Sequence, residues 1–417
     1  MKRPLSVRGA LSSAALPTFE ARDFASKSSP EDAEHSKTAS NPMSRHFVTR
    51  IDHFVSLHKN LLWSNGRIED AKPRFSEEAP LNSVQRCLRC MGAISCFYGL
   101  FIVTLPASTP NPPGKMVDLG GHRLHLNCSG HGSPTVVVEN GQGDFSFDWF
   151  LVQKLVKRFT RICTYDRAGY AWSDPGPLPR TFAQINLELQ DALEKLGESG
   201  PYVLVGHSFG GPVIRNFAAA YPRDVAGLVL VDAAFEGMRV GSGNKHTVQL
   251  GKSGTYREIP QPHEEMTDSD QVAFRSADAS DSSDPLDPVY KKLPQHEQRL
   301  QLWAQNLPAL KKTEENQREW SEIYFAQLLA KPQTASLGSI PTLVLTRAEG
   351  GYESDLDVSA AQMEQERKDG QAMLARLSID SKQTILPCGH NMELEDPAAV
   401  TEAIHEMVNA LRHNRKL

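Results

Sequence analysis

The 417-residue sequence has no strong excess of charge of either sign. It contains 45 Lys and Arg residues against 50 Asp and Glu residues, so its formal net charge is −5. Proteins that bind nucleic acid through phosphate contacts usually carry a basic excess. No acidic run that would form a solvating tail is present either. We therefore expect a globular protein with no nucleic-acid partner.

Cysteine is scarce: the chain has six, at positions 87, 90, 96, 128, 163 and 388. Three of them cluster beside one apolar stretch, and the others lie in or beside predicted strands. This distribution is not a disulfide framework. No Cys/His spacing resembles a zinc site either. We expect neither a disulfide scaffold nor a metal centre.

The amino-terminal region lacks both a sustained hydrophobic period and the apolar core of a secretory signal. Residues 1–86 are rich in Ser, Ala, Pro and mixed charge, so we expect them to be mostly disordered. The stretch Cys90–Gly114 has no charged residue. A membrane-spanning helix needs about 20 mostly apolar residues. The sequence therefore predicts a transmembrane helix at residues 87–108.

Two arginines, Arg86 and Arg89, lie on the amino-terminal side of this apolar stretch. Positive flanks favour the cytoplasmic side of a membrane. The expectation is a single-pass membrane protein, with its large domain on the side opposite the amino terminus.

Beyond Met116 the chain alternates between apolar, β-branched runs and helical segments. The runs lack strict alternation of polar and apolar residues, which is typical of parallel strands covered on both faces. This rhythm covers residues 116–236, lapses over residues 237–339 and resumes over residues 340–417. We predict an α/β fold with a doubly wound, mostly parallel sheet, interrupted by a helical lid at 237–339.

One stretch, Tyr202–Gly211, combines a buried strand with the pattern Gly-x-Ser-x-Gly and a following helix. This context is that of a nucleophile elbow, a sharp turn that raises a serine hydroxyl above the sheet. Gly206 and Gly210 leave room for the helix to pack against the strand. Ser208 is the predicted nucleophile.

A serine needs a neighbouring base, and the chain has 14 histidines. His390 follows the last predicted strand, which places it at the same carboxyl edge of the sheet as Ser208. The third member of the site must be a carboxylate that orients the imidazole. Asp232 follows the strand after the elbow and is the first choice. The alternatives left open lie in the loop after Thr346: Glu349, Glu353, Asp355 and Asp357.

The developing oxyanion requires backbone donors. One is the N–H of Phe209, which follows the nucleophile, and the other comes from the loop after the third strand. Asn140–Gly143 fits that loop, and Gln142 is the predicted donor. Asp166 and Arg167 are interpreted as turn and salt-bridge residues under a neighbouring loop.

Together these motifs resemble the α/β-hydrolase fold superfamily. The resemblance rests on Gly206-His-Ser-Phe-Gly210, Tyr165–Asp174, Asn140–Gly143 and Gly389-His390, and it spans Val117 to the carboxyl end. Within that superfamily the chain is similar to lid-bearing, membrane-anchored serine hydrolases. The resemblance implies an eight-stranded sheet, a Ser-His-acid triad and no cofactor. One departure is Asn140-Gly141, where many relatives have His-Gly.

The expected function is that of a serine hydrolase acting on a small-molecule carboxylic ester or related acyl substrate through an acyl-enzyme. Epoxide hydrolases of this fold use an aspartate nucleophile, so Ser208 argues against that activity. The alternatives are a cofactor-free acyltransferase or peroxidase, or an inactive ligand-binding or scaffold protein. The sequence leaves the oligomeric state open.

Overall fold

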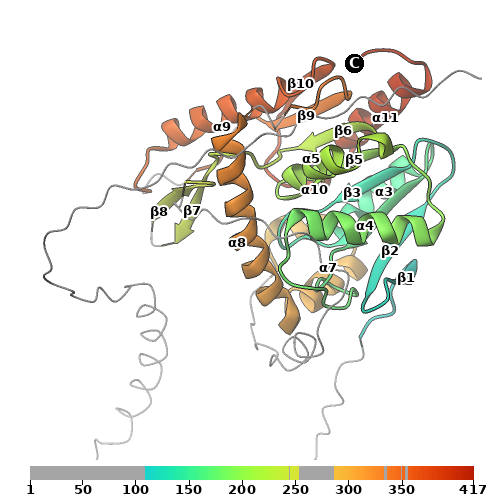
Figure 1. Cartoon of the computed structure of the whole chain (residues 1–417). Coiled ribbons are helices and arrows are strands. Elements are labelled where there is room, and N and C mark those ends of the chain that lie inside the picture. The colour runs from blue at the N-terminus through green and yellow to red at the C-terminus, as the bar shows by residue number, and fades with distance from the viewer. Residues whose placement is uncertain (1–108, 244, 253–285, 333–335, 349, 353–355) are drawn as a thin grey trace, which may run out of the picture. The chain divides into compact units, whose positions relative to one another are not determined.

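The computed structural model describes residues 109–417, except for residues 244, 253–285, 333–335, 349 and 353–355 (Figure 1). Its main sheet has eight strands in the order β1-β2-β4-β3-β5-β6-β9-β10. The strands are β1 (Lys115–Asp118), β2 (Arg123–Ser129), β3 (Val136–Glu139), β4 (Ile162–Asp166), β5 (Tyr202–His207), β6 (Val225–Val231), β9 (Thr342–Arg347) and β10 (Ser381–Leu386). The β1–β2 and β2–β4 pairs are antiparallel, and all other pairs are parallel. The predicted doubly wound, mostly parallel sheet is confirmed.

Helices cover both faces of this sheet. They are α3 (Phe150–Val156), α4 (Phe182–Leu196), α5 (Gly210–Ala220), α9 (Ala360–Ala375), α10 (Met392–Glu395) and α11 (Pro397–Arg412), with the 3-10 turns η2 (Ser146–Trp149) and η3 (Pro222–Asp224). Their ends carry the expected signals. Thr181 caps α4, since its side chain accepts a hydrogen bond from Gln184 N, and Gly197 ends that helix with φ 79°. Asp396 caps α11 in the same way, directly before Pro397.

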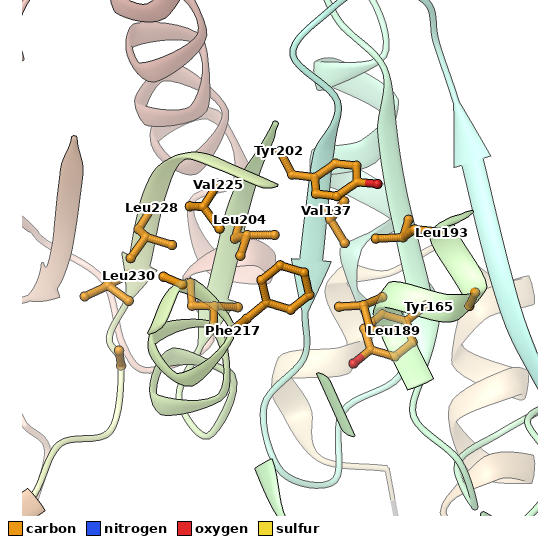
Figure 2. Close-up of a cluster of buried hydrophobic side chains, with 14 of the residues drawn as sticks. Val137, Tyr165, Leu189, Leu193, Tyr202, Leu204, Phe217, Val225, Leu228 and Leu230 are labelled. Atoms are coloured by element: carbon orange, nitrogen blue, oxygen red, sulfur yellow. The ribbon is translucent and has the colours of Figure 1, made fainter. Parts of the chain in front are cut away.

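The core is divided by the sheet into two apolar layers. On one face, α4, α5 and α9 pack against side chains such as Val137, Leu204 and Leu230 (Figure 2). On the other face, α3 and α11 pack against Val138, Val205 and other alternate residues of the same strands. Because both faces are covered, the central strands are apolar at successive positions, and this is why their sequence lacks alternation.

Residues 237–339, here called the insert, lie between β6 and β9. Its described elements are β7 (Arg239–Gly243), β8 (His246–Gln249), η4 (Pro288–Lys292), α7 (Gln295–Ala304) and α8 (Pro308–Ala330). The helical part was expected, but the β7–β8 hairpin was not. This antiparallel pair contains Gly241 and Gly243 and has an irregular register between them, so its sequence has no clear strand period.

The sequence did not predict the disulfide bond that the structure shows. Cys128 and Cys163, which are 35 positions apart in the sequence, form a disulfide. They are direct partners on the antiparallel strands β2 and β4. Only the pairing register brings them together, and sequence spacing does not reveal it.

The prediction of a single-pass membrane protein is overturned. Among the helices that the structure describes, none is both long and apolar enough to cross a bilayer. The predicted transmembrane segment at residues 87–108, like the region 1–86, lies outside the described residues. The described structure therefore does not support the expected membrane partner or membrane location.

Candidate active site

The turn between β5 and α5 holds Ser208 in a constrained conformation. Ser208 has φ 49°, in the left-handed region that non-glycine residues rarely adopt. Its N–H donates to Val231 O at 3.1 Å, and its carbonyl accepts from Ala234 N at 2.9 Å. A Cβ on Gly210 would lie 2.2 Å from Glu139 O, so only glycine fits this close approach. The local geometry is that of the predicted elbow.

His390 and Asp232 meet at the same edge of the sheet. Asp232 directly follows β6, and His390 lies in the loop between β10 and α10. His390 Nδ1 lies 2.6 Å from Asp232 Oδ2. Since β5, β6, β9 and β10 are parallel neighbours, the segments that follow them all leave at one edge, where Ser208 also lies. Ser208 Oγ makes no hydrogen bond with His390, and such contacts are often long until substrate binds.

Asp232 is nearly fully buried, and its carboxylate contacts both His390 and Arg347. Arg347 Nε, at the end of β9, is 3.2 Å from the same Asp232 oxygen that contacts His390. Burial alone would raise the pKa of Asp232, but the hydrogen bond from His390 and the charge of Arg347 lower it overall. Asp232 is therefore ionised at neutral pH, as a residue that orients an imidazole must be.

The competing carboxylates do not meet His390 within the described part of the chain. Glu349, Glu353 and Asp355 lie outside the described residues. Asp357 instead binds β8, with Oδ1 accepting from Thr247 N at 3.0 Å. Asp232 is thus the described candidate that contacts the histidine.

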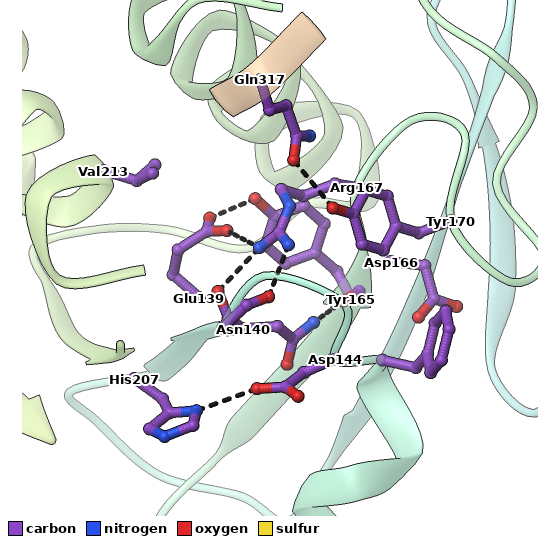
Figure 3. Close-up of polar contacts among 12 residues, drawn as sticks. Glu139, Asn140, Asp144, Tyr165, Asp166, Arg167, Tyr170, His207, Val213 and Gln317 are labelled. Atoms are coloured by element: carbon purple, nitrogen blue, oxygen red, sulfur yellow. Dashed lines mark hydrogen bonds and ion pairs between the residues drawn. The ribbon is translucent and has the colours of Figure 1, made fainter. Parts of the chain in front are cut away.

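The loop that carries Gln142 rests on a fully buried arginine (Figure 3). Arg167 Nη1 donates to Asn140 O at 2.7 Å, and Nη2 donates to Gly141 O at 2.6 Å. The same Nη1 lies 2.7 Å from Glu139 Oε1. The interpretation of Arg167 as a salt-bridge residue under a loop is confirmed, and that loop is the predicted oxyanion loop. Asp166, at the end of β4, contacts His125 and the Ser146 N–H.

A cavity of about 1010 Å³ opens beside Ser208 and Gln142. Its walls come from the β7–β8 hairpin and α8, which lie next to each other in Figure 1. The apolar residues that line it are Phe209, Ala234, Met238, Val240, Val248, Leu250 and Phe325. Three acidic and three basic residues complete the lining: Glu315, Glu319, Glu322, Arg239, Lys252 and Arg318.

Two large aromatic residues of the insert, Trp303 and Tyr324, do not line this cavity. Trp303 packs against Trp172, with ring centroids 5.2 Å apart. Tyr324 packs against Phe182 at 4.7 Å. Both are packing residues, and Phe325, which sequence reasoning did not single out, faces the cavity instead.

Sequence reasoning also missed a polar cluster behind the site. His207, the variable residue before the nucleophile, contacts Asp144 and the backbone of His390. Glu393, on α10, is buried beside it. His207 lies inside the Gly-x-Ser-x-Gly motif, directly before Ser208. This position is the sequence signal that could have identified it.

One group of side chains in the described part has metal-ligand spacing: Cys128, Cys163 and Glu198. Its two sulfur atoms are joined in the disulfide, so they do not act as thiolate ligands. We assign no metal to this group.

A model of the alpha/beta hydrolase family matches residues 118–403 of the chain. The chain belongs to the alpha/beta hydrolase family. Membership supports a hydrolase that acts on a small-molecule substrate. The crystal structure of lip1 from Acinetobacter baumannii has the same fold, with a TM-score of 0.51 and 17% identity, over 72% of this chain and 92% of that one.

Curated relatives of this alpha/beta hydrolase match it over shorter segments. Epoxide hydrolase 4 of Homo sapiens is 28% identical over 140 residues, or 33% of this chain and 38% of the relative. A protein named as a transporter, efuK of Hormonema carpetanum, is 35% identical over 139 residues, or 31% of this chain and 20% of the relative. The chain spans less than half the length of either protein.

Proposed function

We propose that the protein is a serine hydrolase that cleaves carboxylic esters. Ser208 is the nucleophile, His390 the general base and Asp232 the carboxylate that orients the base. The supporting observation is the 2.6 Å contact of His390 Nδ1 with Asp232 Oδ2, at the sheet edge where the elbow presents Ser208. This contact leaves His390 Nε2 available to accept the serine proton.

In the proposed reaction, Ser208 Oγ attacks the ester carbonyl carbon while its proton passes to His390 Nε2. The carbonyl electron pair moves to the oxygen, which accepts hydrogen bonds from the N–H groups of Gln142 and Phe209. When the intermediate collapses, the C–O bond to the alcohol breaks and His390 protonates the departing oxygen. Water then attacks the acyl-enzyme carbonyl carbon while His390 takes its proton. The bond to Ser208 Oγ breaks, His390 returns a proton to Ser208, and the carboxylic acid is released.

The cavity favours an ester with an apolar acyl group. Ser208 and Gln142 lie in its lining together with Met238, Leu250 and Phe325. These apolar residues favour binding of a hydrocarbon group at their part of the cavity. The insert, which supplies most of these walls, acts in this proposal as the lid of the site.

Labelling with a fluorophosphonate probe tests the nucleophile. The wild-type chain should form an adduct and hydrolyse p-nitrophenyl esters, and Ser208→Ala should do neither. A folded wild-type protein without a Ser208-dependent adduct would refute the proposal. It would favour the inactive ligand-binding alternative.

The carboxylate is tested separately. Asp232→Asn should lower kcat by about a hundredfold or more at neutral pH, because the amide no longer stabilises the imidazolium. Asp357→Asn, whose carboxylate binds β8, should retain activity. Near-normal hydrolysis by Asp232→Asn, together with loss of activity in Glu349→Gln or Asp355→Asn, would assign the acid to the later loop.

A further inference from the structure

His207 is buried between the oxyanion loop and the candidate base, and both of its ring nitrogens face oxygen atoms. Nδ1 lies 2.9 Å from Asp144 Oδ2 (Figure 3), and Nε2 lies 3.0 Å from the backbone oxygen of His390. A carbonyl oxygen only accepts hydrogen bonds, so Nε2 must carry a proton. The protonation of Nδ1 depends on the state of Asp144.

Asp144 is an ionised carboxylate in this environment. Burial opposes its charge, but the hydrogen bond with His207 and the charges of His207 and Arg167 lower the pKa of Asp144 overall. Its second oxygen, Oδ1, lies 3.4 Å from the hydroxyl of Tyr290, which donates to it. Nδ1 of His207 therefore donates as well, so both nitrogens carry protons and the ring is an imidazolium.

The charged ring lies directly against the candidate base. The ring centroids of His207 and His390 are 4.7 Å apart. A positive charge at this distance opposes a second positive charge on His390. We propose that His207 is a permanent imidazolium that positions the His390 backbone and keeps the His390 side chain neutral and ready to accept a proton. This inference rests on the proposed role of His390 as the base.

The electrostatic balance supports this assignment. Burial opposes the charge on His207, but Glu393, Asp144 and Asp232 outweigh it and raise the pKa of His207 to about 10. For His390, burial and the charges of His207 and Arg347 lower the pKa, and they outweigh the opposing effect of Asp232. The base therefore stays neutral at physiological pH while the ring behind it stays charged.

Other titratable groups lie around the His207–His390 pair. Within the described residues, Asp144, Asp232, Arg347 and Glu393 interact with one or both rings. Asp148, Arg167 and Tyr290 interact with Asp144. Glu393 Oε2 is 3.9 Å from His207 Nε2. Burial raises the pKa of Glu393 to about 7, against the opposing charge of His207. Glu393 thus titrates within the range of interest, and an experiment must separate it from His390.

The test is a histidine NMR titration of the full chain labelled with ¹⁵N-histidine. In wild type at pH 8, both ring nitrogens of His207 should be protonated. In His207→Gln the amide can still donate to the His390 backbone, but the charge is lost. A unit charge about 5 Å away at an effective dielectric of about 20 shifts a pKa by about two units. The His390 side chain is 33% exposed, so solvent screening reduces this effect, and we expect the pKa of His390 to rise by about one unit.

The matched control is His125→Gln, which alters another buried histidine paired with a carboxylate, Asp166, at 2.7 Å. It should leave the pKa of His390 unchanged. The wild-type protein and His207→Gln are each measured again with Glu393→Gln added. This substitution removes the titration of Glu393 from both curves. The acid limb of kcat/KM for a p-nitrophenyl ester should move upward in His207→Gln by the same amount as the NMR pKa.

A neutral His207 in wild type at pH 8 overturns the inference, and so does a His390 pKa that stays the same or falls in His207→Gln. If His207→Gln fails to fold, the wild-type spectrum decides alone: a doubly protonated ring supports the inference and a neutral ring refutes it. If the NMR shift is present but Ser208 forms no fluorophosphonate adduct, the proposed function fails and the charge on His207 stands.

Discussion

Arg167 links the buried strands to the loop that presents Gln142. Its planar guanidinium spans two backbone carbonyls of that loop and the Glu139 carboxylate. A lysine would keep the charge but has no rigid fork of donors, so it cannot hold both carbonyls in the same geometry. The position of the proposed oxyanion donor therefore depends on a fully buried residue.

We predict that Arg167→Lys lowers kcat by about tenfold or more, with a smaller change in KM. Loss of one oxyanion donor costs about a hundred- to a thousandfold, and a displaced donor should cost less. The measurement is steady-state ester hydrolysis. Arg180→Lys is the matched control, since Arg180 is equally buried but pairs with Glu188, away from the loop. It should reduce stability and leave kcat unchanged. Equal loss of kcat in both variants would contradict the role given to Arg167.

At the scale of elements, the packing of α5 against the end of β3 depends on a residue without a side chain. A Cβ on Gly210 would meet Glu139 O at 2.2 Å, which is backbone and cannot move aside cheaply. We predict that Gly210→Ala destabilises the fold by about 1–3 kcal/mol or more. Urea unfolding should show a lower midpoint with an unchanged m value.

Gly121→Ala provides the comparison, because an added Cβ there meets nothing within 4 Å. That variant should stay within about 0.5 kcal/mol of wild type. A Gly210→Ala protein as stable as Gly121→Ala would show that the elbow tolerates a wider separation of strand and helix.

The sequence predicts best the strands that are buried on both faces of the sheet, because such strands are apolar at successive positions. β5 and β6 are continuous apolar runs, and each is followed by a residue of the proposed triad, Ser208 or Asp232. The β7–β8 hairpin was missed because both strands are short and β7 contains two glycines. His207 and Arg347 were missed for another reason: their roles depend on partners brought near by the order of the strands, and that order is not encoded in local pattern.

At the scale of the whole molecule, buried ion pairs couple folding to pH. Glu188 is almost fully buried, and its oxygens lie 2.5 Å and 2.7 Å from the two terminal nitrogens of Arg180. Burial alone would raise the pKa of Glu188, but Arg180 and His122 lower it to about 2. A carboxyl with a depressed folded-state pKa contributes stability above its unfolded pKa, about 4.3, and loses that contribution as the pH falls toward 2.

We therefore predict that the free energy of unfolding falls as the pH drops from about 4.5 toward 2, with a contribution from Glu188 on the order of 3 kcal/mol. Glu188→Gln should be less stable at pH 7, because Arg180 remains buried without its partner, and the acid slope should be shallower. Urea unfolding between pH 2.5 and 7 measures both. An acid slope identical to that of wild type would assign the loss to other carboxylates.

The position of the insert has a consequence for how this scaffold can change. β6 and β9 are hydrogen-bonded neighbours, although residues 237–339 lie between them in the chain. Asp232 leaves the sheet just before the insert, and Arg347 and His390 follow it, so their spacing is fixed by strand pairing rather than by the intervening segment. Under the proposed function, the insert that supplies most of the cavity walls forms a module separate from the proposed catalytic residues. We expect that exchanging this module changes the substrate range while the proposed catalytic residues keep their spacing.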